Sequence, residues 1–206
     1  MNIKFVNVSK KFDDKIILNN FSDEVKSGDF CCVFGESGSG KTTLLNMVGF
    51  LEPYEGKILY DNDEVTTTKE KQRLLSSYIG FLFQDYGLVE NDTVYNNFSL
   101  IKNFNKIKHK GLVEECLKKV GLGGFVNRKV YALSGGEQQR VAIAKLLFKQ
   151  PKLILADEPT ASLDSENKAQ IIQLLLTLNN SGATVLLVTH DQEFKEYANQ
   201  VIELLL

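Results

Sequence analysis

Four short runs of apolar residues stand out along the chain, at residues 30–34, 79–83, 153–156 and 184–188. A run of this length without polar interruption is typical of a strand that is buried on both faces. Such strands form parallel sheets that helices cover on both sides. The runs are followed by polar positions, namely Gly35, Gln84, Asp157 with Glu158, and His190 after Thr189. Because ligands bind at the carboxyl ends of parallel strands, these endings together predict one site.

Two further sequence patterns occur outside these four runs. The stretches 3–8, 16–18 and 57–60 are short and alternating or apolar among turn residues, which predicts an antiparallel β subdomain beside the parallel core. Between Gln84 and Ser134 the chain is rich in Lys, Asn and Glu with helical spacing, and Gly121 is placed to end a helix. We therefore expect an α/β fold with an inserted helical subdomain, at about residues 88–150.

Composition narrows the class of protein. A length of 206 residues predicts one domain, residues 1–206, and 43% hydrophobic with 24% charged residues is ordinary globular usage. Lys plus Arg number 24 and Asp plus Glu 26, so no basic excess indicates a nucleic-acid partner. Three cysteines, two of them adjacent, favour reduced thiols in the cytoplasm. No apolar run approaches the ~18 residues of a membrane span, and the start lacks a signal-peptide core, so any membrane would be reached through a partner.

The first chemical motif is a phosphate loop at residues 35–42, which read Gly-Glu-Ser-Gly-Ser-Gly-Lys-Thr and match G-x-x-x-x-G-K-[ST]. It follows a predicted strand and precedes a helical run, as the motif requires. Backbone N–H groups would surround the β-phosphate, Lys41 would reach the β- and γ-phosphates, and Thr42 would ligate Mg²⁺. The alternative, a Gly/Ser-rich turn with an incidental lysine, is weak because all the specified positions match between a strand and a helix. The predicted nucleotide contacts are Gly35, Ser37, Gly38, Ser39, Gly40, Lys41, Thr42 and Thr43.

A pair of carboxylates, Asp157 and Glu158, follows the run at 153–156, and Pro159 ends the strand. Side chains of successive strand residues point in opposite directions, so the two acids can serve different partners. We expect Asp157 to bind Mg²⁺, directly or through water, and Glu158 to polarise the attacking water. An isolated Asp-Glu would more often be an exposed turn. The phosphate loop makes that alternative the weaker one here.

A second anion site is indicated where residues 133–140 read Leu-Ser-Gly-Gly-Glu-Gln-Gln-Arg and open a helix. Ser134 and Glu137 have capping-box spacing. Gly135 and Gly136 are poor helix formers, at roughly 1 kcal/mol each relative to alanine, so a plain cap would not favour them. Uncovered N–H groups at a helix N-terminus suit a phosphate. Taken alone, this reading and a flexible hinge are equally plausible.

Together the phosphate loop, Leu-Ser-Gly-Gly-Glu-Gln-Gln-Arg, Leu-Ala-Asp-Glu-Pro-Thr and Thr-His-Asp occur in an order that resembles the nucleotide-binding subunit of an ABC transporter, over essentially the whole length. The resemblance implies a P-loop NTPase core that hydrolyses ATP with Mg²⁺. It also implies a homodimer or pseudo-dimer in which two subunits pair head to tail, with two ATP molecules between them. The phosphate loop of one subunit then faces Ser134, Gly135 and Gly136 of the other.

The same resemblance assigns four more positions. Gln84 would touch Mg²⁺ or the water and sense a membrane partner, and His190 would hold the γ-phosphate. Asp164, in the stretch 161–164 with Ser162, would cross the dimer interface. Phe12 would lie against adenine. A lone histidine is more often structural, but the place of His190 at a strand's carboxyl end beside this site favours a functional role. For Phe12 the alternative is a core or an exposed hydrophobe.

Finer features resemble one branch of the family. Residues 36–46 and 80–84 are similar to those of macrolide exporters, lipoprotein-releasing complexes and bacteriocin or antimicrobial-peptide exporters, the small bacteriocin-export ATPases above all. Asn96-Asn97 departs from the Glu-Asn common in that branch. The resemblance implies export through a separate permease at the inner face of the cell membrane. Two alternatives stay open: an ATPase that signals to a membrane partner without cargo, and a soluble ABC protein of repair, translation or cluster assembly.

The segment after Gln84 adds one expectation about the partner. Tyr86, Leu88 and Val89 are apolar residues in a loop that also carries acidic residues. Such residues suggest a contact patch for the membrane subunit, with local packing as the alternative.

Overall fold

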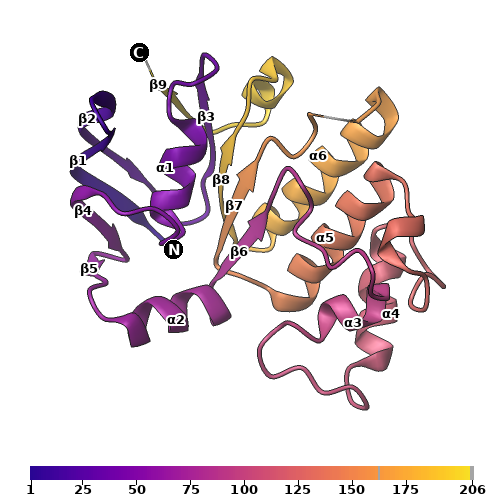
Figure 1. The fold of residues 1–206 in the computed structure, drawn as a ribbon. Helices are drawn as coiled ribbons and strands as arrows, with labels where there is room; N and C mark the ends of the chain where they lie inside the picture. Colours follow the sequence, from indigo (N-terminus) through magenta and orange to yellow (C-terminus); the bar gives the residue numbers. More distant parts are fainter. Residues whose placement is uncertain (162, 205–206) are drawn as a thin grey trace.

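The computed structural model describes residues 1–161 and 163–204. Within these residues the centre is a five-stranded sheet with the strand order β6-β7-β8-β3-β9 (Figure 1). Its strands are β6 (Ile79–Leu82), β7 (Leu153–Asp157), β8 (Thr184–Val188), β3 (Phe30–Gly35) and β9 (Gln200–Leu204). Every pairing in it is parallel, so the carboxyl ends of the strands lie at one edge. The parallel core predicted from the apolar runs is confirmed.

One strand of this sheet, β9, lies outside the four predicted runs. It pairs with β3, from Cys31 opposite Gln200 to Gly35 opposite Leu204. The side chains of β9 alternate between buried and exposed instead of forming a continuous apolar run. In the sequence this alternation is visible only over residues 202–204, which read Ile-Glu-Leu.

The antiparallel subdomain is also confirmed. Its strand order is β2-β1-β4-β5, formed by β2 (Lys15–Val25), β1 (Ile3–Phe12), β4 (Glu55–Tyr60) and β5 (Asp63–Glu64). The apolar face of β1 carries Ile3, Phe5 and Val8, which are buried in the same cluster as helix α1 (Lys41–Val48). This sheet therefore packs beside the start of the phosphate loop helix.

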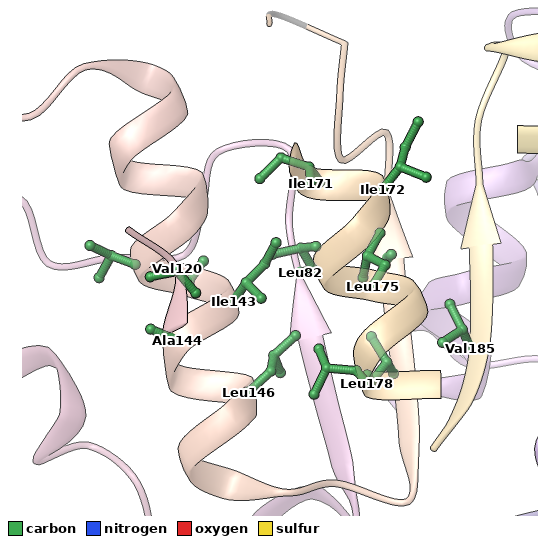
Figure 2. Close-up of a cluster of buried hydrophobic side chains, with 14 of the residues drawn as sticks. Leu82, Val120, Ile143, Ala144, Leu146, Ile171, Ile172, Leu175, Leu178 and Val185 are labelled. Carbon is green, nitrogen blue, oxygen red and sulfur yellow. The ribbon is translucent and has the colours of Figure 1, made fainter. Parts of the chain in front are cut away.

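Helices cover both faces of the parallel sheet (Figure 1). Alternate side chains of β3 divide between two cores: Cys31 and Val33 pack with α1, whereas Cys32 belongs to the core of the opposite face. That second core is formed with α5 (Gly135–Lys149) and α6 (Ser165–Asn180). Figure 2 shows its inner layer, in which Ile143 and Leu146 meet Leu175 and Leu178.

The helical part between Gln84 and Ser134 contains α3 (Val94–Phe98), α4 (Lys110–Lys119) and the 3-10 turn η1 (Val130–Ala132). Gly121, at φ +74°, follows the end of α4, as its position in the sequence predicted. Val113, Cys116 and Leu117 of α4 are buried against the α5 side of the core. This packing fixes the start of α5, which carries Ser134 as its N-cap.

Two further elements complete the described chain, α2 (Thr68–Ser77) and the 3-10 turn η2 (Gln192–Glu196). Helix α2 has no fully buried residue, and its Leu74 packs half-buried against the core, so its apolar side is too short to be clear in the sequence. Its N-terminus carries a capping box between Thr67 and Glu70, which was the readable signal. No helix in residues 1–161 or 163–204 is long and apolar enough to cross a membrane.

Candidate functional site

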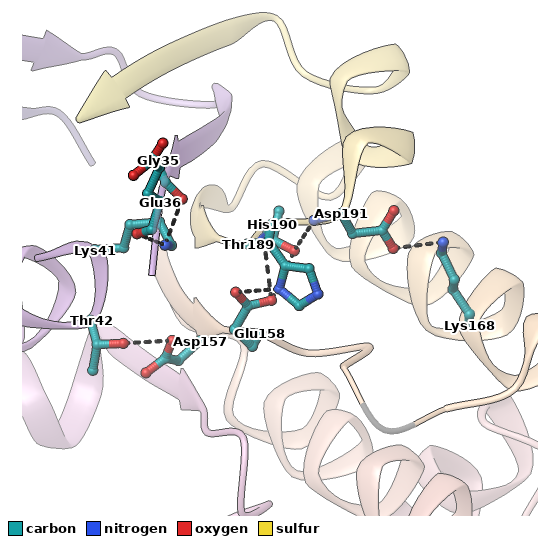
Figure 3. Close-up of polar contacts among 10 residues, drawn as sticks. All are labelled: Gly35, Glu36, Lys41, Thr42, Asp157, Glu158, Lys168, Thr189, His190 and Asp191. Atoms are coloured by element: carbon teal, nitrogen blue, oxygen red, sulfur yellow. Dashed lines mark hydrogen bonds and ion pairs between the residues drawn. The ribbon is translucent and has the colours of Figure 1, made fainter. Parts of the chain in front are cut away.

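The carboxyl ends of β3, β7 and β8 bring the predicted phosphate loop, carboxylates and histidine to one place (Figure 3). Val33 of β3 pairs with Val188 of β8, and Asp157 of β7 pairs with the same Val188. A surface hollow beside the loop is lined by Gly35, Glu36 and His190. The sheet register therefore assembles side chains that lie more than a hundred positions apart in the sequence.

The phosphate loop bends through two glycines in the left-handed region, Gly38 at φ +83° and Gly40 at φ +90°. Residues with a Cβ avoid these angles, which is why the motif requires glycine there. A side chain at Gly40 would also collide with Ile17 of β2. The antiparallel subdomain thus packs directly on the loop and supports its shape.

The residues of the loop fit a magnesium nucleotide. The hydroxyl of Ser39 is buried without a hydrogen-bond partner among the described residues. Lys41 Nζ donates to the backbone carbonyls of Gly35 and Glu36, at 2.8 and 2.9 Å. Phosphate oxygens would satisfy both donors, and they would do so at a helix N-terminus. Bound Mg²⁺ would supply positive charge that offsets the phosphate oxygens during transfer.

The predicted metal ligands Thr42 and Asp157 lie in contact. Thr42 Oγ1 donates to Asp157 Oδ1 at 3.1 Å (Figure 3). Burial raises the pKa of Asp157 above its usual value, and the charge of Glu158 adds to this, against the lowering effects of Thr42 and Lys41. A hydroxyl and a carboxylate are oxygen donors of the kind that Mg²⁺ takes.

The carboxylate of Glu158 contacts three donor groups in the segment that directly follows the neighbouring strand β8. Thr189 Oγ1 donates to Oε2 at 3.0 Å, the backbone N–H of His190 reaches the same oxygen at 3.4 Å, and Nδ1 of His190 lies 2.9 Å from Oε1. Glu158 also has a positive φ of 44°, a backbone conformation that costs of order 1 kcal/mol for such a residue. The carboxylate is therefore fixed in direction, as a group that polarises water needs to be.

Gln84, a predicted contact of the metal or the water, lies near this cluster without touching it. Gln84 is exposed just beyond β6, whose Leu82 pairs with Ala156 of β7, so it emerges at the same edge as Asp157. No hydrogen bond joins Gln84 to Asp157 or Thr42 among the described residues. Its assignment stays a prediction.

Phe12 lies at the end of β1, next to the β2 strand that packs on the phosphate loop. Its ring is 43% exposed, and Lys10 Nζ lies 4.4 Å from the ring centroid. Phe12 is therefore not a buried core residue, and Lys10 lies over one part of its ring. A partly exposed aromatic ring at the end of this hairpin fits stacking on a base, and the role stays a prediction.

The second anion site begins with a complete capping box. Glu137 N–H donates to Ser134 Oγ at 3.3 Å, and Ser134 N–H donates to Glu137 Oε2 at 2.8 Å. This geometry favours a defined N-terminus of α5 over a flexible hinge. Ser134 itself is exposed, so its N-terminus is open to a ligand.

The glycines of this motif have neighbours that sequence reasoning missed. A side chain at Gly135 would collide with the hydroxyl of Tyr86, and one at Gly136 with the amide of Asn167. The glycines therefore admit two polar side chains close to the helix backbone. Nothing in the local sequence signals this, because both neighbours come from other elements.

Asp164 is the N-cap of α6 and accepts the backbone N–H of Asn167 at 2.8 Å. Its carboxylate pKa is held below the usual value, chiefly by that hydrogen bond and by the Asn167 side chain. Ser162, in the same predicted stretch, lies outside the described residues. The loop that would cross a dimer interface is thus anchored at its end.

The segment after Gln84 is partly packed against the rest of the chain. Leu88 is half-buried against the core of the α5 face, which fits the alternative of local packing. Tyr86 is half-buried and lines a surface groove with Phe83, and Val89 is a large exposed hydrophobe. The contact patch stays a prediction.

A phosphate loop after the first strand of a parallel sheet, with carboxylates at the end of a neighbouring strand, defines a P-loop nucleotide hydrolase. The family profile for the ABC transporter matches residues 18–161. The chain belongs to the ABC transporter family, and it is an ATPase of that family, with ATP and Mg²⁺ as cofactors.

Known relatives match over nearly the whole chain. The lipoprotein-releasing system ATP-binding protein LolD of Aquifex aeolicus is 39% identical over 96% of this chain and 91% of its own length. The macrolide export ATP-binding/permease protein MacB of Campylobacter jejuni is also 39% identical over 96% of this chain, which spans only 32% of that protein.

A solved structure shares the fold. The dimeric structure of MJ0796, a bacterial ABC transporter cassette, superposes with a TM-score of 0.88 at 38% identity, covering 98% of this chain and 94% of that one. The same cassette has been solved as a dimer in a post-hydrolysis state bound to ADP and Pi, with a TM-score of 0.86.

Proposed function

We propose that the chain powers export of a bacteriocin, antimicrobial peptide, lipoprotein or drug through a separate membrane permease, from the inner face of the cell membrane. The observation that carries this proposal is the similarity to LolD, which extends over nearly all of both proteins. MacB, whose name joins an ATP-binding part to a permease, supports the need for a membrane subunit. Residues 1–206 would act as one ATPase domain with a helical subdomain at about 88–150, and without a nucleic-acid partner.

The active unit would be a head-to-tail pair of such chains, as a homodimer or with a related second subunit. Helix α1, which follows the phosphate loop, packs on one face of the parallel sheet, whereas α5 packs on the other. The N-terminus of α5 at Ser134 is exposed, so a phosphate carried by a second chain could reach it. A second copy turned end to end would bring its phosphate loop to that terminus, and the similar MJ0796 cassette has been solved as a dimer.

Within each composite site the chain's own groups would divide the work of hydrolysis. Lys41 would hold the β- and γ-phosphates, and Glu158 would orient the attacking water. His190 would contact the γ-phosphate while its Nδ1 faces Glu158. Thr42, Gln84 and Asp157 would hold the metal, and Ser134 and Asp164 of the second chain would close the site.

A groove gives the membrane subunit a place to bind. It has a volume of about 510 Å³ and lies between α2, β6, α5 and the segment after α3. The rings of Phe81 and Phe83 stack along it at a centroid distance of 4.9 Å. Leu100, on its rim, is 65% exposed. An apolar groove that opens beside Gln84 would link binding of the partner to the nucleotide site.

Reconstitution tests the proposal. The chain is expressed with a tag in its native cells, the membrane protein that co-purifies with it is reconstituted into proteoliposomes, and ATPase is measured with candidate cargo inside or outside. Export predicts that cargo both raises ATP turnover and moves out of the ATP-containing compartment. The Glu158→Gln variant, which should form the complex without turnover, serves as the control for passive leakage.

Other outcomes separate the alternatives. ATP turnover that responds to the permease without any cargo movement would support a signalling ATPase instead. Movement of cargo toward the ATP-containing compartment would reverse the proposed direction, because the nucleotide site itself does not set it. Failure to recover any membrane protein under conditions that preserve the complex would favour a soluble ABC protein.

A further inference from the structure

Lys168, in the first turn of α6, forms two close ion pairs with the segment that follows His190. Its Nζ lies 2.6 Å from Asp191 Oδ2 and 2.7 Å from Glu193 Oε2. Figure 3 shows the Lys168 side chain directed at Asp191, beside His190. The Lys168 and Asp191 side chains are only 23% and 20% exposed. These distances are those of charge-assisted hydrogen bonds, in a place partly shielded from solvent.

A continuous path of hydrogen bonds leads from this lysine to the catalytic carboxylate. Asp191 N–H donates to Thr189 Oγ1 at 3.0 Å, and that hydroxyl donates to Glu158 Oε2 at 3.0 Å. Asp191 Oδ1 also accepts the backbone N–H of Glu193 at 3.1 Å, which caps η2. Asp191 is therefore held on one side by Lys168 and on the other contacts the residues that orient Glu158.

The turn that carries Lys168 is itself firmly tied to the second anion site. Asn167, its neighbour, donates from Nδ2 to Asp164 Oδ2 at 2.8 Å and accepts a hydrogen bond from Arg140 of α5. The same amide fills the space beside Gly136. One helical turn thus joins the segment after His190 to the start of α5 and to Asp164.

The charges of this arrangement are stable over the range in which enzymes are assayed. Hydrogen bonds with Asp191 and Glu193 raise the pKa of Lys168 above its usual value. Burial alone would raise the pKa of Asp191, but Lys168 and the Glu193 N–H outweigh it, and that pKa ends below its usual value. The pair therefore stays ionised between about pH 4 and pH 10.

We propose that Lys168 is a positioning residue for ATP hydrolysis. It fixes the segment of His190 and Asp191 to the first turn of α6, and so sets the direction of the Glu158 carboxylate relative to the turn that carries Asp164. The Lys168 side chain lies at the surface end of α6 and is only partly shielded from solvent, so loss of the lysine should leave the fold intact. Misplacement of a catalytic group by about 1 Å costs up to ~100-fold in rate, so loss of Lys168 should lower the rate of ATP turnover.

The test compares Lys168→Met with Lys168→Arg by steady-state ATPase, with nucleotide affinity measured by titration of a fluorescent ATP analogue. We expect Lys168→Met to lower kcat about tenfold, while KM and nucleotide affinity change less than about threefold, because the phosphate loop is untouched. Lys168→Arg keeps the charge and should recover kcat to within about threefold of the wild type.

A matched control removes an ion pair far from the site. Lys57→Met breaks the pair with Glu64, whose N–O distance of 2.8 Å is similar and which joins β4 to β5 on the surface. Its kcat should equal that of the wild type. A third variant, Glu193→Gln, removes one partner of Lys168 and should lower kcat less than Lys168→Met. The double variant with Lys168→Met should be no slower than Lys168→Met alone.

Three results would overturn the proposal. An unchanged kcat in Lys168→Met, with only a lower melting temperature, would reduce the ion pairs to a structural role. Equal loss of kcat in Lys168→Arg and Lys168→Met would remove the charge as the cause. If Lys168→Met fails to fold, a wild-type kcat in Glu193→Gln together with a slow Lys168→Arg would have the same effect. None of these outcomes depends on which cargo the transporter moves.

Discussion

Nδ1 of His190 lies 2.9 Å from Oε1 of Glu158, although the two residues are 32 positions apart. The contact follows from the parallel pairing of β7 with β8, which brings the ends of the two strands to one edge. It joins a side chain assigned to the attacking water with one assigned to the γ-phosphate. Any movement of the His190 segment therefore also moves the carboxylate that orients water.

The first prediction concerns this carboxylate. Glu158→Gln keeps the shape and the contact with Thr189 but removes the negative charge that polarises water. We expect ATP to bind normally and hydrolysis to slow at least about a hundredfold, the scale of losing a general base. Phosphate release by the purified variant measures it. Glu115→Gln, an exposed acid of α4 away from the site, is the control, and near-normal turnover in Glu158→Gln would remove the assigned role.

The second prediction is that this slow variant associates only with nucleotide. Each ATP would need Lys41 of one chain and Ser134 of another, so hydrolysis-deficient chains should accumulate as pairs. Light scattering of Glu158→Gln should report mainly monomer alone and dimer with MgATP. Adding Ser134→Arg should block the dimer, because the long arginine side chain would fill the space at the start of α5 where the other chain's nucleotide would bind. Nucleotide should still bind to the phosphate loop of the variant. A protein that stays monomeric with ATP bound would count against the head-to-tail arrangement.

The sequence predicts most of the fold because its strongest signals come from burial. The strands β3, β6, β7 and β8 are continuous apolar runs, which predict a parallel sheet, whereas the strand order β6-β7-β8-β3-β9 comes from the structure. Strand β9 exposes alternate residues and α2 has no fully buried residue, so neither carries such a run. What the sequence misses are elements that bury only a few side chains, such as Ile202 and Leu204 of β9.

The candidate site is predictable to the extent that its residues sit in fixed local patterns. Lys41, Thr42 and Asp157 follow from spacing around a strand end. Asn167 and Lys168 do not, since they reach Gly136 and Asp191 only through the packing of α6 against other elements. Sequence distance hides contacts of this kind, and only the fold shows them.

The third prediction concerns Lys145, which lies half-buried at the groove. Burial lowers its pKa to about 8, with a smaller effect from Lys149. An unfolded lysine titrates near ~10.4, so the unfolded chain holds more protons between those values and stability rises with pH there. Lys145→Met should remove this rise, which is on the order of 1–3 kcal/mol.

Urea unfolding at pH 7.5 and pH 9.5 measures the effect. Lys145→Met should be more stable than the wild type at the lower pH, and the difference should shrink at the higher one. Lys119→Met, an exposed lysine on α4, should follow the wild type at both. Parallel pH dependences in Lys145→Met and wild type would show that the charge is well solvated in the native state.

The fourth prediction tests the groove as the docking surface of the membrane subunit. Leu100→Asp places a charge on its rim and should weaken co-purification of the permease at least about tenfold, because a buried unpaired charge is costly at an interface. Basal ATPase of the isolated chain should be unchanged. Ile107→Asp is the matched control, since Ile107 is 91% exposed and lies outside the groove. Equal assembly of both variants would move the docking surface elsewhere.

The last prediction concerns the choice of base. Phe12 is partly exposed at the end of the β1–β2 hairpin, whose Ile17 packs on the phosphate loop, and stacking on a base is worth roughly 1–3 kcal/mol. A phenyl ring carries no hydrogen-bonding group, so it does not distinguish adenine from guanine. Phe12→Ala should therefore weaken ATP binding about tenfold, near the low end of that range, and the wild type should accept GTP within about an order of magnitude of ATP.

Titration of both nucleotides into both proteins checks this. Another aromatic residue of the hairpin, Phe21, packs against the core, so its substitution would perturb the fold. The better control is Ile16→Ala, which removes another exposed side chain of the same hairpin. An unchanged ATP affinity in Phe12→Ala would place the base elsewhere. Strong rejection of GTP by the wild type would require a base-reading hydrogen bond, and because a ring face cannot supply one, a polar group near the β1–β2 hairpin would have to provide it.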